Sequence, residues 1–61
     1  MLYKEIIYRY ANPFRNREVM YAVYLDVEKI EENNDADFIF TTDGQRHFVA
    51  KEYIGRQVVP A

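Results

Sequence analysis

Two runs of aromatic and β-branched residues surround an Asp-Gly dipeptide in the middle of the chain, and this pattern is the strongest constraint on its fold. Phe38–Thr42 precedes Asp43-Gly44, and His47–Ala50 follows it. Aromatic and β-branched residues suit a pleated strand surface, and Asp-Gly tolerates the positive φ angles of a two-residue type I′ turn. The sequence therefore predicts a β-hairpin over residues 38–50.

A two-residue turn would also fix the register of this hairpin. Phe40 would face His47 and Ile39 would face Phe48, which leaves both faces of the hairpin largely apolar. Because two isolated strands are marginal in water, such a hairpin has to lie within a larger structure. We expect it to be the middle of a small sheet or barrel.

The flanking segments also favour strands. Leu2–Tyr10 is rich in tyrosine and isoleucine, and Arg56–Val59 is a short run that stops before Pro60. Between Leu2–Tyr10 and the hairpin, Asn33–Asp35 predicts a turn or an irregular loop. Ala11–Arg17 predicts a loop, because it contains a proline that lacks an N–H group and restricts the residue before it.

The segment Glu18–Glu28 fits two interpretations. As a strand it places Val19, Tyr21, Val23 and Leu25 on one face, and as a helix it forms an apolar stripe. Periodicity alone does not separate the two. The β-branched and aromatic content favours the strand, since these side chains lose χ1 freedom in a helix.

The order of elements is two longer strands, a hairpin, a helical turn over Lys51–Ile54 that Gly55 closes, and a short last strand. This order resembles that of the SH3-like small barrels, which place a 3₁₀ turn between their fourth and fifth strands. We therefore expect one all-β domain over residues 1–61, a small SH3-like five-stranded barrel with a 3₁₀ turn near residues 51–54. The alternative is an α+β fold with residues 18–32 helical.

The C-terminal segment His47–Pro60 also resembles the end of Sm-like RNA-binding proteins. In that family a lysine-bearing turn carries an apolar residue into a Val-Val-Pro strand, and here Lys51, Ile54 and Val58-Val59-Pro60 stand in similar positions. The spacing differs, and the N-terminal helix of the family has no counterpart in this sequence. The resemblance implies a small barrel.

Composition limits how a chain of 61 residues can be stabilised, because a domain of this size buries only about 60% of its unfolded surface. The chain has no cysteine and a single histidine, which excludes disulfides, thiolate metal sites and histidine-rich zinc sites. We expect no cofactor and no metal. A tight core or self-association remains, and six tyrosines and four phenylalanines favour both. We expect a homo-oligomer, with a dimer as the first choice.

Charge and hydropathy indicate the surroundings of the protein. No apolar run approaches the roughly 20 residues that span a bilayer, and the start of the chain lacks the pattern of a signal peptide. We expect a cytoplasmic protein that does not bind membranes. The net charge of −2 argues against non-specific nucleic-acid binding, although the acidic residues concentrate in the middle of the chain and both ends are basic.

The segment from Arg9 to Arg17 is the strongest candidate for a binding loop. It contains three arginines, no acidic residue and two aromatic side chains. Arginine presents a planar fork to phosphate or carboxylate groups, and aromatic rings offer a stacking face. The alternative is a solvated loop. The predicted partner-binding residues are Arg9, Tyr10, Phe14, Arg15 and Arg17, with Tyr24 and Tyr53 as flanking contacts.

Other chemistry has little support. The chain has no serine or cysteine nucleophile and no glycine-rich phosphate loop. The acidic run that begins at Asp26 resembles a calcium loop only at Asn33–Asp37, and Phe38 stands where the sharp turn needs glycine. A solvated acidic face, or a strip that docks on a basic partner, fits this run better. We expect a structural role for His47.

These observations predict a non-enzymatic protein-interaction module, a regulator or inhibitor that binds a larger protein. The alternative is an oligomeric, nucleic-acid-binding small barrel that uses the same loop together with Lys51 and Arg56.

Overall fold

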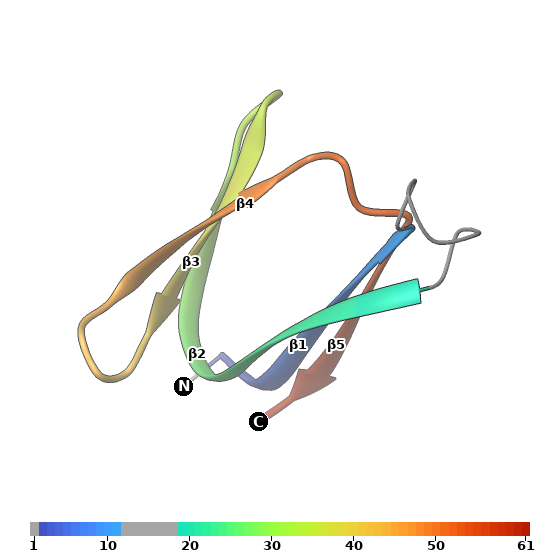
Figure 1. The fold of residues 1–61 in the computed structure, drawn as a ribbon. Helices are drawn as coiled ribbons and strands as arrows, with labels where there is room; N and C mark the ends of the chain where they lie inside the picture. Colours follow the sequence, from blue (N-terminus) through green and yellow to red (C-terminus); the bar gives the residue numbers. More distant parts are fainter. Residues whose placement is uncertain (1, 12–18) are drawn as a thin grey trace.

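The computed structural model describes residues 2–11 and 19–61, which form a single antiparallel sheet of five strands. The strands follow the order β4-β3-β2-β1-β5 across the sheet (Figure 1). They are β1 (Tyr3–Ala11), β2 (Val19–Glu32), β3 (Ala36–Thr41), β4 (Arg46–Ala50) and β5 (Gly55–Pro60). The described residues contain no helix, and hence none that could span a membrane. The all-β prediction is confirmed, and the helical alternative for residues 18–32 is wrong.

β2 is long and bent, and it belongs to both halves of the sheet. Its first half pairs with β1, its second half pairs with β3, and Val27 takes part in both ladders. The bend falls at Asp26, which has a φ of 54° in the left-handed region, and the register with β3 shifts between Val27 and Lys29. Aspartate tolerates left-handed angles better than most residues. The bend turns the two halves of the sheet towards each other (Figure 1).

The core lies on the concave side, between the two halves. Ile6 and Tyr8 of β1 contribute from one half, and Ile39 of β3 and Val49 of β4 contribute from the other. Val27, at the bend, completes this fully or almost fully buried cluster. The alternation of the strands explains the pattern, since every second side chain of a strand points to the same face.

The hairpin of β3 and β4 forms as expected, but its predicted register is wrong. Phe38 faces Phe48 and Ile39 faces His47, one position away from the predicted pairs. Gly44 has a φ of 85°, whereas Asp43 is not in the left-handed region, so a type I′ turn does not form. The Asp43 carboxylate instead accepts hydrogen bonds from the Thr41 hydroxyl and the Gln45 N–H, which stabilises a three-residue connection.

The one-residue change moves side chains between faces. Ile39 and His47 point to the concave side, while Phe38 and Phe48 share the outer face, where Phe48 is 64% exposed. The hairpin therefore has one buried face and one partly open aromatic face. The expectation that it forms the middle of the sheet is wrong, because β4 is an edge strand.

The two other connections that the structure describes differ in how well the sequence predicted them. The turn at Asn33–Asp35 is confirmed, and the Asn33 side chain accepts hydrogen bonds from the N–H groups of Asp35 and Ala36, both 2.8 Å long. The predicted 3₁₀ turn at residues 51–54 is wrong, and a simple turn takes its place. A 3₁₀ helix would need the Ile54 N–H, but this group donates to the carbonyl of Arg9 at 2.8 Å.

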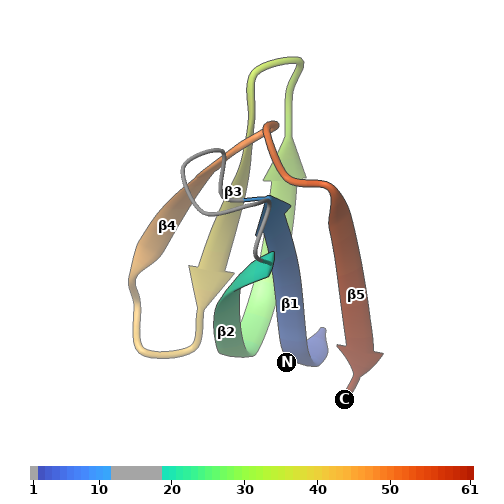
Figure 2. The same cartoon turned by 45° about the vertical axis from the view of Figure 1, so that its right-hand side comes forward.

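The sheet is open. β4 and β5 form its two edges and do not pair with each other, and Figure 2 shows them on opposite sides of the molecule. Each edge strand therefore has one side on which no described strand provides backbone partners.

Candidate interaction surfaces

A buried carboxylate occupies the centre of the concave side. Asp37 of β3 is fully buried, and its Oδ2 accepts hydrogen bonds from the hydroxyls of Tyr8 and Tyr53, at 3.0 and 2.9 Å. Arg56 of β5 donates to the same oxygen at 3.2 Å. The other oxygen, Oδ1, forms no hydrogen bond of good geometry within the described residues, and its contact is an ion pair with Lys51 Nζ at 2.7 Å.

A second carboxylate balances these two cations. Glu32, at the end of β2, forms an ion pair with Arg56 and lies 3.9 Å from Lys51. Two acidic and two basic groups thus neutralise one another. This closed arrangement, which we call the Asp37 network, joins β1, β2, β3, β5 and the connection between β4 and β5 through their side chains.

The network shifts the ionisation of its members. Burial of Asp37 by itself would raise its pKa. The contact with Lys51 and the hydrogen bonds from Tyr53 and Tyr8 outweigh burial, and the pKa of this carboxyl lies below its ordinary value. Burial, followed by the hydrogen bond to Asp37, raises the pKa of Tyr8 and Tyr53. The contact with Asp37 raises the pKa of Lys51, and the hydrogen bond to Glu32 raises the pKa of Arg56.

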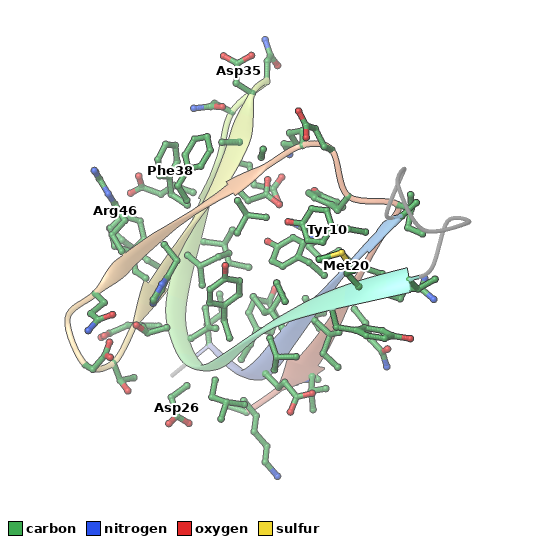
Figure 3. The ribbon with its side chains drawn as sticks, in the orientation of Figure 1. Tyr10, Met20, Asp26, Asp35, Phe38 and Arg46 are labelled. Atoms are coloured by element: carbon green, nitrogen blue, oxygen red, sulfur yellow. The ribbon has the colours of Figure 1, made fainter. Side chains whose placement is uncertain are left out.

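Three of the predicted partner-binding tyrosines gather beside this network. Tyr24 packs edge-to-face on Tyr8 with ring centroids 6.1 Å apart, and Tyr53 packs on Tyr8 at 4.8 Å. Tyr10 lies 6.5 Å from Tyr53, and burial raises the pKa of its hydroxyl. Figure 3 shows Tyr10 near Met20 on the concave side. All three are partly buried against the core, so each offers a partner only part of its ring.

The arginine loop is described only at its start. Arg9 of β1 is exposed, and its guanidinium lies over Gly55 on the neighbouring strand, where an added Cβ would come within 2.5 Å of it. Phe14, Arg15 and Arg17 lie outside the described residues. Of the predicted partner-binding residues in this loop, the structure therefore places only Arg9 and Tyr10, which lie on opposite faces of β1.

The outer side of β3 and β4 carries an aromatic patch. Phe38 and Phe48 meet edge-to-face with centroids 5.6 Å apart, and the Arg46 guanidinium lies 5.4 Å from the centre of the Phe38 ring. Lys29 Nζ lies 4.5 Å from the centre of the neighbouring Phe40 ring. Figure 3 shows Phe38 and Arg46 pointing away from the core. We call Phe38, Phe40, Arg46 and Phe48 the β3–β4 patch.

A second apolar surface runs along the outer side of the first half of β2, with Ile7 of β1 beside it. Val19, Tyr21, Val23 and Leu25 are all exposed, and Tyr21 reaches 65%. Each pairs with an outward-facing residue of β1, and Val23 lies opposite the partly buried Ile7. We call Ile7 and the four β2 residues the β1–β2 face.

An open hollow of about 370 Å³ lies between the bend of β2 and the β3–β4 connection, with Tyr24, Asp26, Thr41, Asp43 and His47 among its lining residues. His47 is partly buried, its ring is 4.9 Å from that of Tyr24, and its Nε2 is 3.2 Å from Thr41 Oγ1. Within the part of the chain that the structure describes, no three histidine, aspartate or glutamate side chains come together as metal ligands would.

Comparison of the chain with models of known protein families, with curated proteins and with solved structures finds no match. The surfaces described above are therefore the basis on which a function can be argued.

Proposed function

We propose that this chain is a non-enzymatic protein-interaction module that binds a larger protein through the β3–β4 patch. The observation that carries the proposal is the exposure of Phe48, a large aromatic side chain that is 64% open to solvent on an edge strand. A regulator or inhibitor acts through such a surface and needs no catalytic groups of its own.

The composition of the patch supports this function. Aromatic residues and arginine are enriched at the centres of protein interfaces, where they supply most of the binding energy. Phe38 and Phe48 already pack edge-to-face, and Arg46 lies against Phe38. These contacts restrict the side chains before binding, so the entropy lost on binding is small. The free edge of β4 also offers backbone groups to which an extended segment of a partner can add as a strand.

Electrostatics favour a protein partner over nucleic acid. Lys29, beside the patch, forms an ion pair with Glu31 at 3.1 Å. Lys51 and Arg56, the cations expected to assist nucleic-acid binding, are engaged by Asp37 and Glu32. A phosphate backbone is bound by cations that are available to replace its counterions. Of the six described lysines and arginines, three (Lys29, Lys51 and Arg56) are already held by carboxylates.

The bent sheet also supports a finer assignment of the fold. We propose that it is an open form of an SH3-like barrel, because one long bent strand is shared by two halves that face each other across a small core. Backbone nuclear Overhauser contacts between β4 and β5 would show closure of the barrel in solution, and their absence would leave the fold as an open sheet.

Capture of partners by variant proteins tests the proposed function. Phe48→Ala removes the most exposed ring of the patch. Ile54→Ala is the matched control, because Ile54 is 61% exposed and lies in the connection between β4 and β5, outside both outer surfaces. Phe48→Ala and Ile54→Ala would both be compared with the wild type by circular dichroism and thermal unfolding before use. We expect one set of proteins to be retained by the wild type and Ile54→Ala and lost with Phe48→Ala.

Equal retention by all three folded proteins would contradict the proposal. Recovery of nucleic acid instead of protein, with binding that weakens steeply as salt is raised, would support the nucleic-acid alternative.

A further inference from the structure

We propose that the β1–β2 face binds the same face of a second copy of this chain, related by a two-fold axis. This inference goes beyond the proposed function and uses a different surface. The axis lies in the interface, at right angles to the strands, and passes along the pair formed by Ile7 and Val23.

The first argument is the apolar surface itself. The exposed positions Val19, Tyr21, Val23 and Leu25 follow one another without a polar residue between them on that side of β2. Monomeric proteins rarely expose contiguous apolar patches of more than a few hundred Å². A second sheet packed about 10 Å away would cover this row as in a β-sandwich.

The second argument is charge. Glu5 and Arg9 lie on the same face of β1, two residues on either side of Ile7. Glu5 is paired with Leu25 and Arg9 with Tyr21. Rotation about the proposed axis exchanges the two ends of this row, so Glu5 of each copy lies over Arg9 of the other, and Leu25 lies over Tyr21. Among the described residues neither Glu5 nor Arg9 takes part in an ion pair.

The third argument is size. An interface of standard size removes about 800 Å² from each partner, which is about a sixth of the 4628 Å² that the chain exposes. β5 pairs with β1 beside this face, so an interface of standard size would use the β1–β2 face together with the adjoining outer side of β5. Because both copies present the same patch, the assembly closes at two.

Charge reversal tests this geometry. Glu5→Arg gives a copy with arginine at both positions, and Arg9→Glu gives a copy with glutamate at both. Each variant places like charges opposite each other in its own dimer, so we expect its self-association to be at least about tenfold weaker than that of the wild type. An equimolar mixture of the two restores every pair, and we expect it to dimerise.

Sedimentation velocity at protein concentrations from about 1 µM to about 1 mM would measure these states. Circular dichroism would confirm that both variants fold. Val23→Glu, on the axis, brings two carboxylates together and is a second variant that we expect to be monomeric. A monomeric wild type over the whole range, or a mixture of folded charge variants that stays monomeric while the wild type dimerises, would overturn the proposal. Loss of partner capture with Phe48→Ala is independent of this result.

Discussion

At the scale of single residues, Asp37 is the side chain on which the fold most depends. Its carboxylate is fully buried and receives three hydrogen bonds and an ion pair. Removing one partner from a buried charged group is costly, because the remaining charges lose their compensation. The Asp37 network therefore holds the connection between β4 and β5 against the core, because this connection carries Lys51 and Tyr53.

We expect Asp37→Asn to lower the free energy of unfolding by about 3 kcal/mol or more at neutral pH. Tyr53→Phe removes one hydrogen bond to the carboxylate and should cost about 1.5 kcal/mol. Urea unfolding followed by circular dichroism measures both. If Asp37→Asn lowered the free energy of unfolding by less than Tyr53→Phe does, a stabilising role for the charge would be contradicted.

The lowered pKa of Asp37 predicts how the stabilisation by its carboxylate depends on pH. Because the carboxyl has a lower pKa in the folded chain than in the unfolded chain, its contribution is fully present above the unfolded pKa, about 3.9. The contribution is lost as the pH falls through the lower, folded value. The difference in stability between the wild type and Asp37→Asn should therefore shrink on acidification below about pH 4. A difference that grows in acid would mean that the folded carboxyl has a raised pKa.

Asp26 is a second residue with an individual role, because it adopts a φ of 54° at the bend of β2. Glycine takes this angle without strain but is more flexible in the unfolded chain, so we expect Asp26→Gly to be close to the wild type. Asp26→Val should be less stable by about 1–2 kcal/mol, since a β-branched residue is strongly disfavoured there. Thermal unfolding of both variants would give this order, and equal stability of the two would contradict the bend.

At the scale of elements, the strands could be predicted because alternation and β-branched content are local properties. The hairpin register could not, because it depends on whether Asp43 adopts a left-handed angle or uses its carboxylate to bind Thr41 and Gln45. The hydrogen bonds of Asp43 also hold the pKa of its carboxyl below the ordinary value.

The candidate surfaces were harder to predict than the strands. Asp37 looked like one member of an acidic run, and its burial depends on Tyr8, which is 29 positions away in the sequence. The row on β2 was visible as one face, but only the tertiary structure decides whether such a face meets the core or solvent. The exposure of Phe48 follows from the hairpin register, so a wrong register also gives the wrong face for Phe48.

Gly44 tests the three-residue connection. Its φ is 85°, and an added Cβ would meet no atom within 4 Å. A substitution there therefore costs conformational energy without a clash, and we expect Gly44→Ala to lower stability by about 1 kcal/mol. Gly44→Asn should cost less, because asparagine tolerates the left-handed region. Chemical denaturation of the two variants would compare them, and equal losses would indicate that the angle is not left-handed in solution.

At the scale of the whole molecule, the balance between core and surface is unusual. Among the described residues, six apolar side chains are fully or almost fully buried, whereas nine large hydrophobic residues are exposed. A chain of this size has a small margin of stability on its own. Covering the β1–β2 face by a second copy would add buried apolar area at the place where the single chain leaves most of it open.

Folding and association should then be linked by mass action, because a dimer that forms only from folded chains stabilises the folded state as concentration rises. We expect the melting temperature of the wild type to increase with protein concentration above the dissociation constant of the dimer. The melting temperature of Val23→Glu should not change with concentration, since this variant cannot bury the face. Calorimetry over about a hundredfold range of concentration measures both. A melting temperature that rises equally for the two proteins would place the association on another surface, and one that stays constant for the wild type would show that the core alone supports the fold.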